Sequence, residues 1–105
     1  MSNLTVELQT CLGIDVTGEF NKETLNKAYK CDNKNIFIIK WLQRFLNSLN
    51  CPQKVDITGL FDVDTKQVLT YFQKEYGYKY KRIPITAELD KPTWELIGEY
   101  LNHIE

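Results

Sequence analysis

The chain contains two closely similar stretches, IDVTGEFNKETLN at residues 14–26 and VDITGLFDVDTKQ at residues 55–67. A shorter and weaker copy, TAELDKPTW, follows at residues 86–94. All three copies share the pattern T-[GA]-x-[apolar]-[DN]-x-x-T. Internal repetition of this kind indicates that one supersecondary unit is used several times, so we interpret the rest of the sequence around it.

The repeated pattern predicts the start of a helix. Asn21, Asp62 and Asp90 are residue types that cap helix N-termini, and in each copy a Thr three positions later can return a hydrogen bond to the cap. Gly18 and Gly59 would allow the turn before the cap to adopt a positive φ. We therefore expect each copy to consist of a tight turn followed by a helix.

The segments around the repeats have helical rather than strand periodicity. The apolar positions are Ile38, Leu42, Phe45 and Leu49, then Val68, Leu69, Phe72 and Tyr76, and finally Trp94, Ile97, Leu101 and Ile104. Two shorter helices are expected near residues 4–12 and 25–29, and Gly77 reads as a helix stop. The sequence therefore predicts an all-α fold, a small bundle of three main helices with an extra N-terminal helical half-repeat.

Composition excludes several classes of protein. A chain of 105 residues with 43% hydrophobic residues is expected to form one domain. The formal charge of −1, with scattered basic residues, argues against nucleic-acid binding. No segment has the length of a membrane span, and the start MSNLTVELQT does not resemble a signal peptide, so we expect synthesis in the cytoplasm and no membrane partner.

Nothing in the sequence suggests a metal, a cofactor or a catalytic centre. The three cysteines, Cys11, Cys31 and Cys51, lack metal-ligand spacing and are expected to be reduced; any bridge should join Cys11 to Cys51. His103 is the only histidine and lies near the C-terminus, where a solvated position is expected. Asp62 and Asp64 are explained by the electrostatics of a helix N-terminus. We therefore predict that the chain is not an enzyme.

A set of short motifs follows in order between about Ile38 and Leu101: Leu42-Gln43, Thr58-Gly59-Leu60-Phe61, Thr65, Phe72-Gln73, Gly77 and Thr93-Trp94. In these residues the chain resembles the peptidoglycan-binding domain-like modules of bacterial and phage cell-wall hydrolases, which are related to the prodomains of matrix metalloproteinases. The Pro-Arg-Cys-Gly switch of the prodomains is absent, which disfavours protease inhibition. The resemblance implies a helical module that binds peptidoglycan, the cell-wall polymer of bacteria.

The first 35 residues look like an additional half-module. Leu8-Gln9 and Thr17-Gly18-Glu19-Phe20 repeat the anchors of the main module. Two short helices cannot bury an apolar face alone, so residues 1–35 should pack on the long helix at Ile36 to Asn50 within residues 36–105, giving one compact domain. The repeat is consistent with duplication.

Two surfaces are candidates for ligand binding. The segment YGYKYKR, in an expected loop from Gly77 to Pro84, combines aromatic rings for sugar faces with cations for stem-peptide carboxylates. Its candidate residues are Tyr78, Lys79, Tyr80, Lys81 and Arg82. The second surface is the turn with Thr58, Gly59 and Asp62. Each has a structural alternative: tyrosines that cap the bundle, and a turn that only starts a helix.

Two functions remain open from the sequence. The first is a non-catalytic module that binds a glycan or stem peptide and brings a phage or bacterial cell-wall hydrolase, such as an endolysin, or a virion protein to the cell wall. The second is a structural or protein-interaction module of a phage tail, baseplate or cell-surface assembly that does not bind glycan. The fold alone does not distinguish them.

Overall fold

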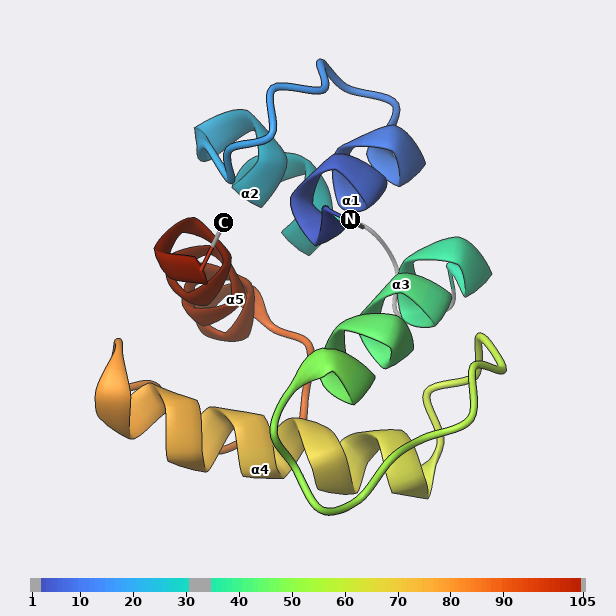
Figure 1. The fold of residues 1–105 in the computed structure, drawn as a ribbon, viewed down its shortest axis with the longest axis vertical. Helices are drawn as coiled ribbons and strands as arrows, with labels where there is room; N and C mark the ends of the chain where they lie inside the picture. Colours follow the sequence, from blue (N-terminus) through green and yellow to red (C-terminus); the bar gives the residue numbers. More distant parts are fainter. Residues whose placement is uncertain (1–2, 31–34, 105) are drawn as a thin grey trace.

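The computed structural model describes residues 3–30 and 35–104. Within these residues, five helices follow one another (Figure 1): α1 (Leu4–Leu12), α2 (Lys22–Lys30), α3 (Ile36–Ser48), α4 (Val63–Lys79) and α5 (Lys91–Ile104). The described part of the chain contains no strand. The predicted all-α fold is confirmed, and both short N-terminal helices are present.

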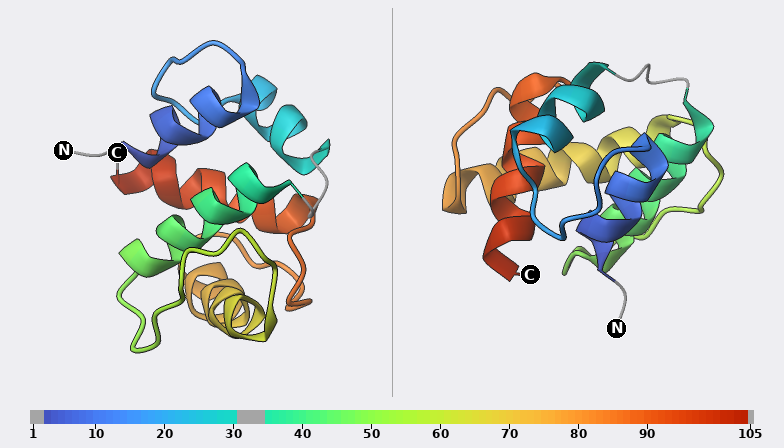
Figure 2. Two further views of the ribbon diagram at one scale, coloured as in Figure 1. Left: turned by 90° about the vertical axis from the view of Figure 1, so that its right-hand side faces the viewer. Right: turned by 90° about the horizontal axis from the view of Figure 1, so that it is seen from above.

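The helices are arranged in three layers, which can be followed in Figures 1 and 2. α3 and α5 form the middle layer, with α1 and α2 on one side and α4 on the other. α1 packs against α3, as expected for the N-terminal half, whereas α2 packs chiefly against α5. The N-terminal repeat therefore packs against two helices of the main bundle, α3 and α5, and not against α3 alone.

The centre of the bundle is aromatic. Trp41 of α3 and Trp94 of α5 are at most 1% exposed, and their rings stack with centroids 5.7 Å apart. Phe45 stacks on Trp41 and meets the edge of Phe72 from α4 at 5.3 Å. The indole N–H of Trp41 donates to the carbonyl oxygen of Leu4 at 2.8 Å, which ties α3 to α1 and satisfies the one polar group of that buried ring.

All three predicted N-caps are present. In each copy the cap oxygen accepts hydrogen bonds from the backbone N–H and the hydroxyl of the Thr three residues later; the pairs are Asn21 with Thr24, Asp62 with Thr65, and Asp90 with Thr93. Gly18 and Gly59 have φ values of 82° and 81°, as expected. Ala87 occupies the equivalent place in the third copy at φ 58°, so that turn keeps its shape with a less permissive residue.

We expect the Asp62 cap to make the stability of the fold depend on pH. Hydrogen bonds from the Thr65 hydroxyl and backbone N–H lower the pKa of Asp62. A lowered pKa contributes stability above the unfolded value of about 3.9, and this contribution is lost as the pH falls through the folded pKa. Asp62→Asn keeps a capping oxygen without the charge, so the variant should lack this loss.

The measurement is the unfolding midpoint of parent and Asp62→Asn between pH 7 and pH 2. The other carboxyl groups titrate in both proteins, so the difference between the midpoints isolates Asp62. We expect the parent's advantage to shrink below about pH 4. A difference that stays constant across the whole range would show that the Asp62 charge does not contribute to the cap.

The prediction that Gly77 ends a helix is wrong. α4 continues through Gly77 to Lys79, and the backbone N–H of Tyr80 still donates to the Tyr76 carbonyl at 2.9 Å. Gly77 is buried, and a Cβ there would lie 3.8 Å from side-chain carbons of both Ile83 and Leu96. These are ordinary van der Waals distances, so Gly77 lies inside the helix without a backbone conformation or a contact that only glycine could provide.

Candidate functional site

Three buried glutamines organise the repeats. Gln9 of α1, Gln43 of α3 and Gln73 of α4 are at most 1% exposed. Each one precedes a repeat and points its amide into the turn of that repeat. A buried amide must satisfy both its donors and its acceptor, and here the turn supplies all the partners.

The bonds of Gln43 show the arrangement. Its Oε1 accepts from the backbone N–H groups of Thr58 and Gly59 at 2.8 and 2.9 Å. Its Nε2 donates to the Leu60 carbonyl at 3.0 Å and to the hydroxyls of Thr58 and Thr65 at 3.2 and 3.0 Å. One side chain thus fastens the turn to the preceding helix and also contacts the Thr that completes the next helix cap.

Gln9 and Gln73 make the same five contacts. Their partners are Thr17, Gly18, Glu19 and Thr24 for Gln9, and Thr86, Ala87, Glu88 and Thr93 for Gln73. This function of the glutamines was not predicted from the sequence. The signal was present, because a Leu-Gln or Phe-Gln pair stands ahead of every copy.

These contacts change how the candidate turn is interpreted. The backbone N–H groups of Thr58 and Gly59 are bonded to Gln43, and an Asp62 carboxylate oxygen is bonded to Thr65. The polar groups of this turn therefore have structural partners already. This placement favours the structural alternative for the turn.

The turn does carry exposed apolar side chains. Leu60 and Val63 are 64% and 68% exposed, and Gly59 lies against Ile36, next to the exposed Phe37 at the start of α3. Exposed apolar residues that gather where two segments meet are typical of contact surfaces.

The residues of the other candidate surface, Tyr78 to Arg82, do not share one environment. Tyr80 is half-buried, and its ring packs against Tyr76, Tyr100 and His103 at centroid distances of 6.3, 5.7 and 5.1 Å. Tyr80 thus caps the aromatic core, as the structural alternative proposed. Tyr78, two residues earlier at the end of α4, is 77% exposed.

Tyr78 and Arg82 stand together at a small cavity. The guanidinium carbon of Arg82 lies 5.3 Å from the centroid of the Tyr78 ring, within the range of a cation–π contact. Both residues line a cavity of about 230 Å³, whose other lining residues are Gln73, Lys74, Gly77, Ile83 and Ile85. The cavity thus combines an apolar wall, an exposed aromatic ring and two cations.

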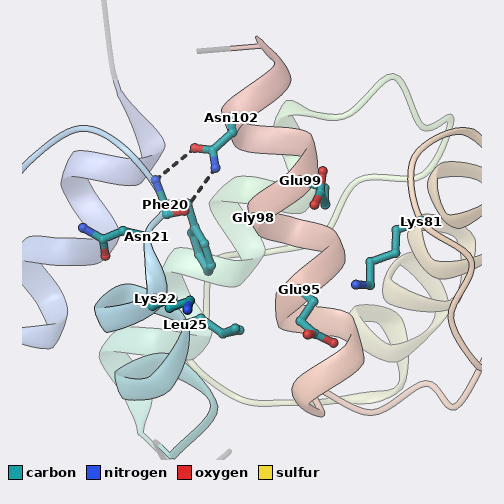
Figure 3. A pocket seen from close by; sticks show the side chains of 9 residues that line it. All are labelled: Phe20, Asn21, Lys22, Leu25, Lys81, Glu95, Gly98, Glu99 and Asn102. Atoms are coloured by element: carbon teal, nitrogen blue, oxygen red, sulfur yellow. Dashed lines mark hydrogen bonds between the residues drawn. The ribbon is translucent and has the colours of Figure 1, made fainter.

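Lys81 faces a different cavity, drawn in Figure 3. This cavity has a volume of about 330 Å³ and lies across α5, between α2 and the segment that follows α4. Lys79 lies in neither cavity lining; its ammonium group is 6.0 Å from the Tyr76 ring centroid. The predicted basic and aromatic segment is therefore divided between two cavities and the aromatic core.

No group of His, Cys, Asp and Glu side chains in residues 3–30 and 35–104 could hold a metal ion, and no helix there is long and apolar enough to cross a membrane. Cys11 and Cys51 are both free thiols, and burial is the main cause that raises the pKa of Cys11. Cys31 lies outside the described residues.

The comparison with protein families agrees with this architecture. A family model described as "Putative peptidoglycan binding domain" matches residues 38–97, which is more than half of the chain. The match begins in α3 and ends in α5, so it includes the turns held by Gln43 and Gln73 and the cavity beside Tyr78. No curated protein and no solved structure matched the chain. The chain belongs to the peptidoglycan binding domain family.

Proposed function

We propose that this protein is a non-catalytic module that holds peptidoglycan at the cavity beside Tyr78 and Arg82. The observation that carries the proposal is an exposed aromatic ring and two cations at an apolar cavity within the residues that match the family. The module acts at the bacterial cell wall. By binding there it would raise the local concentration of an attached or associated hydrolase or virion protein.

The chemistry of the cavity suits the polymer. The face of a sugar ring is apolar and packs on an aromatic face, while the stem peptides carry carboxylates that pair with cations. Tyr78 offers the ring, and Arg82 and Lys74 offer the charges. Because Tyr78 belongs to the last turn of α4, its position is set by a helix that packs against both α3 and α5.

A non-catalytic function is also supported by the surroundings of His103. This single histidine is exposed, and the centroid of its ring lies 5.1 Å from that of Tyr80. It is not among the residues that line either cavity. A general base must lie within hydrogen-bond reach of the group it deprotonates, so the position of His103 outside both linings favours a binding function.

Tyr78→Ala should weaken binding to insoluble peptidoglycan by about 1–3 kcal/mol, or roughly 5- to 150-fold, because an exposed aromatic contact is removed. Co-sedimentation with purified cell walls measures the effect. Tyr29→Ala is the matched control, since Tyr29 is also an exposed tyrosine with a lysine, Lys91, over its ring at 5.2 Å, but lies outside the cavity. The control should bind like the parent.

Arg82→Gln should weaken binding chiefly at low ionic strength, because salt screens an exposed charge. The unfolding midpoints of the three variants should lie close to that of the parent, since exposed substitutions usually change stability by about 0.5 kcal/mol or less. If Tyr78→Ala sediments with cell walls as the parent and Tyr29→Ala do, the cavity beside Tyr78 is not the binding site.

A second function is favoured by the exposed apolar side chains around Gly59. Phe37, Leu60 and Val63 are 64–68% exposed, a pattern typical of protein interfaces. The module would then join a phage or cell-surface assembly through this face. A protein that fails to sediment with cell walls, but forms a stable complex that Leu60→Asp disrupts, would support this function over peptidoglycan binding.

A further inference from the structure

The cavity of about 330 Å³ across α5 depends on parts of the chain outside the family match. Phe20, Lys22 and Leu25 come from the N-terminal repeat, and Glu99 and Asn102 lie beyond residue 97. Only Lys81 and Glu95 among its charged residues fall inside the matched span. The N-terminal repeat therefore adds a binding surface that residues 38–97 by themselves do not form.

The wall on the side of α2 is preformed. The backbone N–H of Phe20 donates to Asn102 Oδ1 at 2.9 Å, and Asn102 Nδ2 donates back to the Phe20 carbonyl at 3.0 Å (Figure 3). The Phe20 ring lies on Gly98, where an added Cβ would be 2.4 Å from the ring. These contacts hold the backbone and the ring of Phe20 in place without a ligand. This wall of the cavity is therefore preorganised, which lowers the entropic cost of binding.

The charges of the cavity alternate in sign. Glu95 and Glu99, one turn apart on α5, lie on the same face of the helix, with Lys81 on one side of it and Lys22 on the other (Figure 3). Within the described residues, no hydrogen bond or ion pair joins either lysine to either glutamate. Both signs of charge are thus open to a ligand that carries an amine and a carboxylate.

We infer that this cavity binds uncrosslinked stem peptides of peptidoglycan. The free side-chain amine of the diamino acid would lie at Glu95 and Glu99, and a peptide carboxylate would pair with Lys81 or Lys22. A crosslink converts that amine into an uncharged amide and removes its attraction to the glutamates. This inference rests on the proposed function and adds to it a preference for wall in which stems are free.

The test uses a soluble probe, the tripeptide L-Ala-γ-D-Glu-L-Lys, and the same peptide acetylated at the lysine side chain. Each is titrated into the full chain, and the shifts of backbone amide resonances are followed by NMR. The free-amine peptide should shift the resonances of residues around Glu95 and Glu99, and acetylation should weaken binding by about 10-fold, because one charge-assisted contact is lost.

The double variant Glu95→Gln and Glu99→Gln should bind both peptides equally weakly, whereas Glu75→Gln, an exposed position on α4 outside both cavities, should behave as the parent does. Equal binding of the two peptides to the parent, or no saturable binding at millimolar concentration, overturns the inference. Sedimentation of the parent with cell walls separates the two proposals. If the parent sediments with cell walls but binds the two peptides equally well, the proposed function is supported and the inference is wrong.

Discussion

Gln43→Glu is expected to lower the free energy of unfolding at pH 7 by about 3–5 kcal/mol, the usual cost of an unpaired buried charge. The substitution keeps the size of the side chain. It removes the two N–H donors that now serve the Leu60 carbonyl and the hydroxyls of Thr58 and Thr65, and it sets a carboxylate oxygen against that carbonyl. Gln43 is completely buried, so water cannot take the place of the lost partner.

The pH dependence of this variant identifies the cause. Burial without a cation should raise the pKa of the introduced carboxyl above the unfolded value of about 4.3. The folded variant then holds its proton at pH 4, and the destabilisation grows as the pH rises through the folded pKa. Urea unfolding of variant and parent at pH 4 and pH 7 should therefore give a larger difference at pH 7.

Gln53→Glu is the control for this substitution. Gln53 is exposed, and its amide donates to the exposed Gln67 side chain at 3.2 Å. Its replacement should change stability by about 0.5 kcal/mol or less. Should Gln43→Glu prove no more harmful than Gln53→Glu, the glutamine contacts would not be what holds the turns to the helices.

Gly59→Ala should lower the free energy of unfolding by about 2–5 kcal/mol through two effects that act together. The backbone of Gly59 has φ 81°, where an L side chain costs about 1–2 kcal/mol. The new Cβ would also lie 2.2 Å from Cγ1 of Ile36 and 3.2 Å from its carbonyl oxygen, and overpacking costs about 1–3 kcal/mol. Relief requires the start of α3 to move away from the turn.

Gly18→Ala separates the two effects, because Gly18 has nearly the same φ, 82°, with no atom within 4 Å of an added Cβ. Only the backbone term should remain, about 1–2 kcal/mol. Thermal or urea unfolding of both variants gives the comparison. Equal losses at the two glycines would mean that Ile36 adjusts freely and that the contact between the turn and α3 has no energetic consequence.

Local pattern was sufficient for the helices and their starts. The caps at Asn21, Asp62 and Asp90, and the positive φ at Gly18 and Gly59, follow from chemistry within a few residues, so they were predictable from sequence. The candidate site was predictable only in part. Tyr78 to Arg82 was recognised as a segment, but whether each side chain faces solvent, a cavity or the core depends on how far α4 extends and on which helices approach it.

Gly77 and Tyr80 show the same limit. Gly77 was expected to end a helix from its local sequence, but α4 continues through it, with Ile83 and Leu96 packed around this buried position. Tyr80 was a candidate ligand-binding residue because it is an aromatic residue in a basic segment. In the structure it packs against Tyr100 and His103 of α5, which lie twenty or more positions further along the chain. A sequence pattern of a few residues cannot identify neighbours that are so distant in the chain.

The sequence by itself determined the number and type of elements, the three repeated helix starts and the family, because these depend on hydrogen bonds and apolar spacing within single turns of the chain. The tertiary structure alone decided which surfaces the repeats create. α2 packs chiefly against α5, and the backbone of Phe20 is hydrogen-bonded to the Asn102 side chain. The cavity lined by Lys22 and Glu99 therefore forms only when residues about eighty positions apart in the chain come into contact. Contacts between distant segments are set by the packing of whole helices, which short-range pattern does not specify.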